Sequence, residues 1–325
     1  MSDLPFTIVT GMPRGGTTAV GRMLTLAPGV VSLHEPLNGD AGLREVVDYF
    51  DHVDIPGDAE AQARIDTTIA RIKGLRGLRF KQGLFQADTG LRGVVKRITG
   101  GRVINTWRRA RFDPFKRHVV WKDPFAAFVT GRAAARHGIG SVITLRNPWA
   151  TAASFKRMGW GMELGHVRAA TATLPRYGAS EDALAPPKSD HVGNATAMWV
   201  MLYAKVLADL EAHGPADAPL TLLDLDAMIA DPLPSYRQIY DTHGLPWSDR
   251  VATQIAQTYA PRGEGARDMP KAGQAHDMRR DPATLNAYWK KVLTEDEAAR
   301  VTALAGPLWD EIRARLDAQS ARDAV

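Results

Sequence analysis

Cysteine is absent from this sequence of 325 residues, and its absence excludes several kinds of chemistry at once. Without a thiol there is no disulfide framework, no thiolate metal site and no cysteine nucleophile. Long apolar runs are also missing, because no window approaches the roughly 18 apolar residues of a membrane span. The first residues show no basic stretch followed by an apolar one, the pattern of a secretion signal. We therefore expect a soluble, cytoplasmic protein.

A large excess of charge of either sign is missing as well. The formal net charge is +5, and 24% of the residues are charged. This balance suits an anionic ligand, but it is too small for a chain of this length to indicate nucleic acid, which we do not expect as a partner. No His, Asp and Glu residues have convincing metal-ligand spacing, so we expect no metal. Because 45% of the residues are hydrophobic, we predict a single domain over residues 1–325.

A glycine-rich turn follows the first apolar run of the chain. Residues 6–9 are Phe-Thr-Ile-Val, residues 11–18 are Gly-Met-Pro-Arg-Gly-Gly-Thr-Thr, and residues 19–26 have helical character. A turn between a strand and a helix points several backbone N–H groups into one concavity at the positive end of the helix. Such a concavity binds phosphate or a similar oxyanion, and the spacing Gly-x4-Gly-x-Thr is that of a nucleotide P-loop.

Thr17 stands where the P-loop of nucleoside triphosphatases has a lysine. Without that lysine, the cation that assists the bound phosphate must come from elsewhere, and Arg14 lies within the turn. A P-loop kinase acting on a small molecule remains an alternative, supported by the loop and the order of strands but opposed by Thr17.

Strand-like and helix-like segments alternate along the chain. Strand candidates occur at residues 30–33, 118–122, 141–145 and 220–225, and helical stretches follow several of them. This alternation is typical of a parallel, doubly wound sheet with right-handed crossovers. We predict a three-layer α/β fold of the P-loop type, with a central parallel sheet flanked by helices.

The remaining segments carry weaker structural signals. Residues 40–117 are predicted to form a helical insertion over the site, with the apolar residues of 43–50 at helical spacing. Residues 175–193 are rich in proline, glycine and polar residues and predict a loop that could act as a lid, followed by a helix capped by Asn194. Thr294 begins a capping box, and Gly306-Pro307 should bend or split the last helix.

Polar residues lie directly after three of the strand candidates. His34 and Glu35 follow one strand, Lys122 and Asp123 end another, and Arg146 follows a third. Ligands of open parallel sheets bind at the carboxyl ends of the strands, so Glu35 should face the same crevice as the glycine-rich turn. A carboxylate there can act as a general base. Arg146, with a hydroxyl held nearby, can grip a phosphate.

Residues 13–18, Pro-Arg-Gly-Gly-Thr-Thr, resemble the phosphosulfate-binding loop of sulfotransferases that use 3′-phosphoadenosine 5′-phosphosulfate (PAPS). Gly15 stands where this family commonly has serine, so one hydroxyl contact to the cofactor would be missing. Arg146 and Ser154 also resemble the family's site for the 3′-phosphate, at the family's own spacing. Residues 226–247 and 287–297 are similar to later family segments, in the family's order.

The resemblance implies a site and a reaction. Transfer of a sulfuryl group from PAPS to a hydroxyl or amine acceptor would use Glu35 as the base, because His34-Glu35-Pro36 is similar to the pattern of the carbohydrate-type and several bacterial branches. The histidine of the cytosolic branch has no counterpart after Lys122, which becomes a second cation on the leaving group. The donor would be bound by Arg14, Gly15, Gly16, Thr17, Thr18, Arg146, Ser154 and, with weaker support, Arg262.

Several alternatives stay open at this point. Residues 96–117 hold eight Lys or Arg against one acidic residue, Asp113, which fits a solvated face, an acceptor-binding surface or a non-enzymatic polyanion-binding module. The acceptor could be a carbohydrate hydroxyl, a lipid-linked group, a small alcohol or an amine. His34 or Asp123 could share the role of base with Glu35. The sequence does not determine the oligomeric state.

Overall fold

The computed structural model describes residues 4–81, 101–213, 218–260 and 287–323. The chain divides into two compact units. The first comprises Met1–Leu145 and Asp209–Tyr259, and the second comprises Arg146–Ala208 and Ala260–Val325. Among the described residues, no helix combines the length and the apolar character needed to cross a membrane. A single domain over the whole chain stays a prediction.

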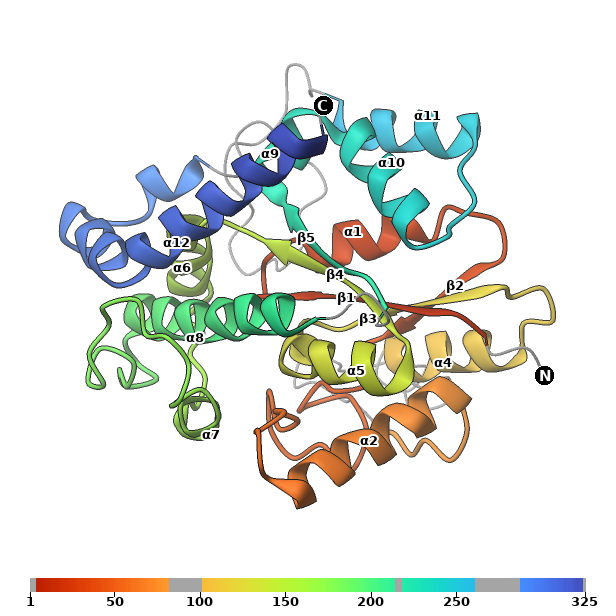
Figure 1. Cartoon of the computed structure of the whole chain (residues 1–325), viewed down its shortest axis with the longest axis horizontal. Coiled ribbons are helices and arrows are strands. Elements are labelled where there is room, and N and C mark those ends of the chain that lie inside the picture. The colour runs from red at the N-terminus through yellow and green to blue at the C-terminus, as the bar shows by residue number, and fades with distance from the viewer. Residues whose placement is uncertain (1–3, 82–100, 214–217, 261–286, 324–325) are drawn as a thin grey trace, which may run out of the picture. The chain divides into compact units, whose positions relative to one another are not determined.

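The first unit is built on a five-stranded sheet in which every pair of neighbouring strands is parallel. Its order is β2-β3-β1-β4-β5 (Figure 1). The strands are β1 (Phe6–Gly11), β2 (Val30–His34), β3 (His118–Lys122), β4 (Gly140–Leu145) and β5 (Leu220–Asp224). This arrangement confirms the predicted α/β fold with a central parallel sheet. Because all carboxyl ends meet at one edge, the loops after β1, β2 and β3 share that edge.

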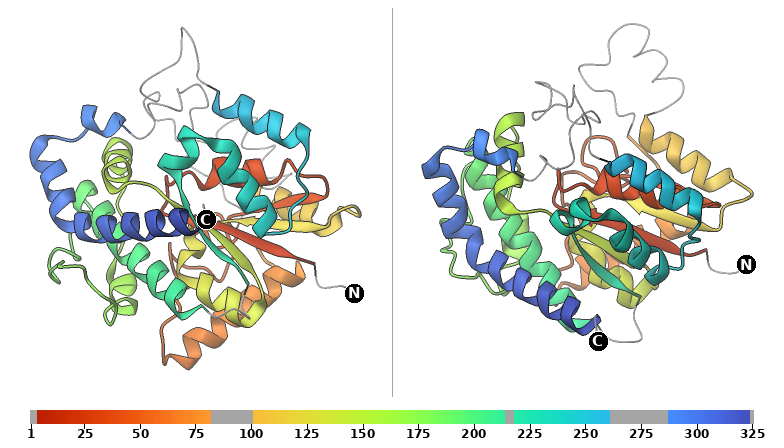
Figure 2. Two further views of the ribbon diagram at one scale, coloured as in Figure 1. Left: turned by 45° about the horizontal axis from the view of Figure 1, so that its top comes forward. Right: turned by 90° about the horizontal axis from the view of Figure 1, so that it is seen from above.

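Helices cover both faces of this sheet, as Figure 1 and the two views of Figure 2 show. One face carries α1, α10 and α11, and the other carries α5 and α2. In chain order the helices of this unit are α1 (Thr17–Leu24), α2 (Ala59–Gly74), α4 (Arg102–Phe112), the 3-10 helix η1 (Pro124–Val129), α5 (Thr130–His137), α9 (Leu225–Ala230), α10 (Pro232–Thr242) and α11 (Asp249–Tyr259). The three layers predicted from the alternation are therefore present.

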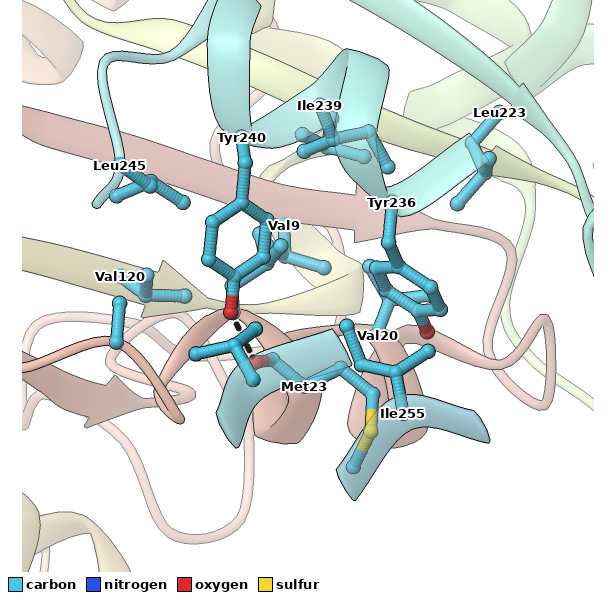
Figure 3. Packing of buried hydrophobic residues seen from close by; sticks show 14 of the residues in the cluster. Val9, Val20, Met23, Val120, Leu223, Tyr236, Ile239, Tyr240, Leu245 and Ile255 are labelled. Carbon is cyan, nitrogen blue, oxygen red and sulfur yellow. Dashed lines mark hydrogen bonds between the residues drawn. The ribbon is translucent and has the colours of Figure 1, made fainter. Parts of the chain in front are cut away.

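A tyrosine pair of α10 closes the core between the sheet and α1 (Figure 3). Tyr236 and Tyr240 are fully buried in the same apolar cluster as Val9 and Val20. The Tyr240 hydroxyl donates a hydrogen bond of 2.7 Å to the carbonyl of Met23 near the end of α1, which also accepts the Leu26 amide at 3.1 Å. Burial of each large ring stabilises the packing by a few kcal/mol. The core thus fixes the helix that follows the glycine-rich turn.

The predicted helix at residues 43–50 is wrong. The segment has turns and an isolated bridge between Leu43 and Phe80, although most of its apolar side chains are buried. The Asn38 side chain accepts hydrogen bonds from the amides of Asp40 and Ala41 just before it. Such local bonds offer the backbone an alternative to a helix. The helical part of the insertion, among described residues, is α2 and α4.

The second unit is helical. It contains α6 (Pro148–Met158), α7 (Gly165–Ala170), most of α8 (His191–Ala212), the 3-10 helix η3 (Tyr288–Lys291) and α12 (Glu295–Asp323). Trp149 of α6 stacks on Trp289 with 5.9 Å between ring centroids and meets Trp309 of α12 edge-on at 6.3 Å. Trp199 of α8 also contacts Trp309, at 6.2 Å. Indole rings from four segments therefore form the centre of this unit.

The start of α8 differs from the prediction. The loop before it ends at Asp190, whose side chain accepts the amide of Gly193 at 3.0 Å and so acts as the cap. Asn194 lies inside the helix and bonds both backbone groups of Met162, at 2.8 and 2.9 Å. A polar residue near a helix start predicts a local cap, but the side-chain amide of Asn194 instead bonds Met162, which is 32 positions away. A lid function for residues 175–193 stays a prediction.

The last helix is not split. The capping box is confirmed, because Thr294 and Glu297 each accept the other's amide, at 3.2 and 2.8 Å. However, α12 continues through Pro307. A proline inside a helix costs about 3 kcal/mol. The buried side chains of Val301, Leu308 and Ile312 lie on one stripe of this helix, and their packing offsets that cost.

Two buried histidines at the amino end of the sheet predict a pH dependence of stability. His118 and His243 both contact the Thr7 hydroxyl, at 2.9 and 3.4 Å. Burial lowers the pKa of each from 6.5 to about 4, with the charge of His118 contributing at His243. Between these values the unfolded chain binds protons that the folded chain does not. The free energy of unfolding should therefore fall as the pH decreases from 6.5 to 4, by up to about 3 kcal/mol per histidine.

Urea unfolding at pH 7, 5.5 and 4.5 measures this loss. Because carboxylates also titrate in this range, the comparison is with His118→Gln, which should lose less stability on acidification than the wild type. Parallel pH curves for the two proteins would contradict the assignment.

Candidate functional site

The glycine-rich turn lies between β1 and α1 and has an unusual backbone. Gly11, Arg14 and Gly16 have φ angles of 138°, 69° and 82°. The amide of Gly15 closes the turn with a bond of 2.8 Å to the carbonyl of Met12. Gly16 is the N-cap of α1 and offers no side-chain cap, so no cap side chain occupies the first amides of the helix. This is the geometry of an oxyanion cradle.

Each of the three glycines has a close neighbour. An added Cβ would lie 2.5 Å from the Thr144 carbonyl oxygen at Gly11, 2.6 Å from the Met12 carbonyl oxygen at Gly15, and 2.8 Å from a Leu225 methyl at Gly16. At Gly11 and Gly15 the close atoms are backbone oxygens, so a Cβ at either position would require the backbone to move. At Gly16 the close atom is the end of a leucine side chain, and the φ of 82° is what favours glycine there.

Glu35 lies at the carboxyl end of β2 and contacts three side chains. One carboxylate oxygen, Oε1, forms an ion pair with the ammonium of Lys122 and lies 3.7 Å from His34 Nε2. The other, Oε2, accepts a hydrogen bond of 2.8 Å from the Asn38 amide. The Glu35 backbone has a φ of 44°, in the left-handed region that non-glycine residues rarely adopt. Such conformations concentrate at functional sites, where surrounding contacts maintain them.

The charge of Glu35 is set by two opposing effects. Burial alone would raise the pKa of this carboxyl, but the positive charge of Lys122, that of His34 when it is protonated, and hydrogen bonds from Lys122 and Asn38 hold the pKa below its usual value of 4.5. The side chain is 18% exposed. Glu35 is thus a carboxylate at neutral pH, partly open to solvent and able to accept a proton.

Lys122 occupies the middle of this edge of the sheet. Within the register it pairs with His34 on one side and with Val9 on the other, so its strand separates β2 from β1. Its stem passes close to α1, because a Cβ added at Gly21 would lie 3.0 Å from Lys122 Cγ. The side chain is only 5% exposed. One buried cation therefore lies beside both Glu35 and the helix that begins at the glycine-rich turn.

Asp123 is fully buried, and both of its oxygens are occupied. Oδ2 accepts the Leu37 amide at 2.7 Å and the Trp121 indole at 3.3 Å, and Oδ1 accepts the Phe125 amide at 3.0 Å. Burial and the nearby charge of Glu35 raise its pKa to about 7, against the effect of these bonds. This geometry makes Asp123 the anchor of the turn that carries Glu35.

Two contacts of this turn were not identified from the sequence. The first is the bond from Asn38 to Glu35, whose signal would have been a polar residue three positions after the base. The second is a bond of 3.1 Å from the His34 amide to the Thr106 hydroxyl of α4. Nothing in the sequence connects these residues, which are 72 positions apart.

The basic run of residues 96–117 is described only from residue 101 onward, and four of its arginines lie on α4.

Arg146 and Ser154 lie in the second unit, at the start of α6 and along it. Arg146 follows β4 directly and is 8% exposed, with its guanidinium 5.6 Å from the centroid of the Tyr288 ring. Its carbonyl accepts the Trp199 indole at 2.9 Å. Asn147 caps α6 by accepting the Ala150 amide at 2.8 Å. Ser154 is 1% exposed.

The other predicted site residues are placed as follows. Arg14, Gly15, Gly16, Thr17 and Thr18 form the turn and the first positions of α1, where Thr17 is buried and Thr18 is partly buried. Arg262 lies outside the described residues. Among those that are described, no three His, Asp or Glu side chains gather as metal ligands would.

A family comparison assigns the class of the protein. The model of the sulfotransferase family matches residues 5–249, which include the glycine-rich turn, Glu35, Lys122, Arg146 and Ser154. This match spans well over half of the chain. The chain therefore belongs to the sulfotransferase family.

Several solved structures resemble the chain at low identity. The sulfotransferase domain of the olefin synthase from Synechococcus PCC 7002 is 13% identical, with 93% of this chain and 94% of that one covered and a TM-score of 0.43. Sulfotransferase STF9 from Mycobacterium avium is 13% identical, with 96% and 77% covered and a TM-score of 0.42. Mouse sulfotransferase SULT7A1, complexed with PAP, is 12% identical, with 93% and 85% covered and a TM-score of 0.41. No curated protein sequence matches the chain significantly.

Proposed function

We propose that the protein transfers a sulfuryl group from PAPS to a hydroxyl or amine of an acceptor, with Glu35 as the general base. The pairing of Glu35 with Lys122 at the carboxyl ends of adjacent strands carries this proposal. In the strand order the cation lies one strand, and the carboxylate two strands, from the strand that precedes the glycine-rich turn. Neighbouring strands lie about 4.8 Å apart, so base and turn are separated by roughly 10 Å, which leaves room for a small reacting group.

The turn fits the phosphosulfate end of such a donor. Gly15 and Gly16 add no side chains of their own to the turn. The amides at the start of α1 and the charge of Arg14 complement an anion. When bound, PAPS supplies a sulfuryl group already attached to a good leaving group, the 5′-phosphate. With Thr17 at the lysine position, Arg14 is the cation within the turn that would contact the donor.

Residues of this chain would carry out proton transfer and stabilise the charge on the donor. Glu35 accepts the proton of the acceptor hydroxyl or amine through Oε1 or Oε2. Arg14 and the first amides of α1 stabilise negative charge on the donor, and each such contact is worth about 2–4 kcal/mol in the transition state. Lys122 holds Glu35 ionised and lies near enough to α1 to share its charge with the leaving group. Because the side chain of Lys122 is buried, its ammonium stays beside Glu35 instead of extending into solvent.

The role of Glu35 predicts a separation of turnover from binding. Glu35→Gln keeps the shape of the side chain and removes the base, so the turnover number should fall roughly 10²-fold or more. The affinity for adenosine 3′,5′-bisphosphate should change little, because this product does not carry the acceptor. Turnover assays and calorimetric titration measure the two quantities. His34→Ala is the matched control and should lower turnover less; the opposite ranking would move the base to His34.

The pairing with Lys122 predicts the pH dependence of the reaction. Because the pKa of Glu35 lies below 4.5, the acid limb of kcat/KM in the wild type should also lie below pH 4.5. Lys122→Met removes the charge that lowers this pKa and leaves the burial that raises it. The acid limb should therefore move to higher pH, in addition to any loss of rate. Asn38→Ala, which removes one hydrogen bond, should move it less, and an unshifted limb in Lys122→Met would argue against Glu35.

The assignment of Arg146 and Ser154 predicts which part of the nucleotide they recognise. Arg146→Ala should weaken adenosine 3′,5′-bisphosphate roughly 10- to 100-fold, because a charge-assisted hydrogen bond is lost, and Ser154→Ala should weaken it less. Neither change should matter much for adenosine 5′-monophosphate, which lacks the 3′-phosphate. Thermal protection by each nucleotide without magnesium reports the affinities. Equal losses for both nucleotides would contradict the assignment.

A further inference from the structure

Arg157, in the last turn of α6, has a buried head group that nothing yet explains. The residue as a whole is only partly buried, but all three guanidinium nitrogens are shielded from solvent. None of the three has a hydrogen-bond partner among the residues that the structure describes. The charged end is therefore turned inward while part of the stem reaches the surface.

This orientation is the reverse of the usual one. A surface arginine lays its apolar stem on the protein and keeps its charged head in water. Burying a charge without a partner costs several kcal/mol, and a guanidinium cannot avoid the cost by losing its proton. Lys156, the residue before it, does have partners. Its ammonium pairs with Glu297 at 2.6 Å and donates a hydrogen bond to the Val292 carbonyl at 3.1 Å. Arg157 is an exception within its own helix turn.

The position of Arg157 on α6 indicates what its head group serves. Ser154 lies three residues earlier, so the two side chains share one face of the helix, with about 5–6 Å between their Cβ atoms. Side chains on a helix lean toward its N-terminus, which directs Arg157 over the turn that contains Ser154. Arg146 lies at the start of the same helix. Two guanidinium groups and a buried hydroxyl thus belong to one short segment of the second unit.

We propose that Arg157 is a specificity-determining ligand for the 3′-phosphate of the nucleotide donor, acting with Arg146 and Ser154. This inference rests on the proposed function and adds a residue to it. A phosphate monoester carries a charge of about −1.5 to −2 at pH 7, which one arginine does not balance. A second guanidinium completes the charge and offers the forked geometry that phosphate oxygens accept. The bound phosphate in turn supplies the partner that the buried head group needs.

Nucleotide discrimination tests this role directly. The ratio of the dissociation constants of adenosine 5′-monophosphate and adenosine 3′,5′-bisphosphate measures recognition of the 3′-phosphate. Arg157→Gln should lower this ratio about 10-fold or more, and Arg157→Lys, which keeps the charge without the fork, should lower it less. Arg168→Gln changes an exposed arginine of α7 in the same unit and should leave the ratio unchanged.

The melting temperature without nucleotide provides a second test, because it should rise while nucleotide binding weakens. Arg157→Met replaces a buried charge that has no protein partner by an apolar side chain of similar length. Its melting temperature without nucleotide should rise by about 2 °C or more, while the protection given by adenosine 3′,5′-bisphosphate falls. If Arg157 only supported the fold, the melting temperature would fall and the discrimination ratio would stay the same.

The outcomes separate this inference from the function on which it rests. A wild type that binds both nucleotides equally would overturn the proposed donor, and the role of Arg157 with it. A wild type that discriminates, with a ratio lowered by Arg146→Ala but not by Arg157→Gln, would overturn the role of Arg157 alone. Equal weakening of both nucleotides by Arg157→Gln would also overturn it.

Discussion

The ion pair between Glu35 and Lys122 is the interaction on which the carboxyl edge of β2 and β3 depends. It forms because β2 and β3 are parallel neighbours in a register that sets His34 opposite Lys122. The left-handed backbone at Glu35 costs on the order of 1–3 kcal/mol. A bond of 2.8 Å from its amide to the Lys122 carbonyl, together with the Asp123 anchor, offsets that cost. The same pair lowers the pKa of Glu35, so one contact fixes the positions of both side chains and keeps Glu35 ionised.

The glycine-rich turn depends on a different constraint, which is close packing. Gly11 and Gly15 each lie against a backbone oxygen that leaves no room for a Cβ, and Gly16 has a left-handed backbone that favours glycine, so this path of the chain depends on all three. The helix that follows is held by the bond from Tyr240 to Met23 and by the apolar cluster around it. An oxyanion cradle built on rigid elements needs little reorganisation when an anion binds, which favours both affinity and transition-state stabilisation.

The fold treats three buried or partly buried cations differently. Lys122 is neutralised by Glu35 and Lys156 by Glu297, whereas the guanidinium of Arg157 meets no acceptor among the described residues. The first two pairs stabilise the protein by itself. An inward charge without a protein partner lowers stability, and binding of the proposed phosphate would supply the missing partner.

Local patterns in the sequence determined the glycine-rich turn, the parallel sheet, the order of its strands in the chain and the capping box of α12, because each depends on residues a few positions apart. Those patterns also placed Glu35 and Lys122 at strand ends. Only the tertiary structure decided that these two side chains meet, that Asp123 and Thr106 hold their turn, that Asn194 binds Met162 instead of capping a helix, and that residues 43–50 are not helical. Each of these outcomes depends on which distant segments become neighbours, because a buried polar group must find its hydrogen-bond partner there. The spacing of residues along the chain does not show which segments these are.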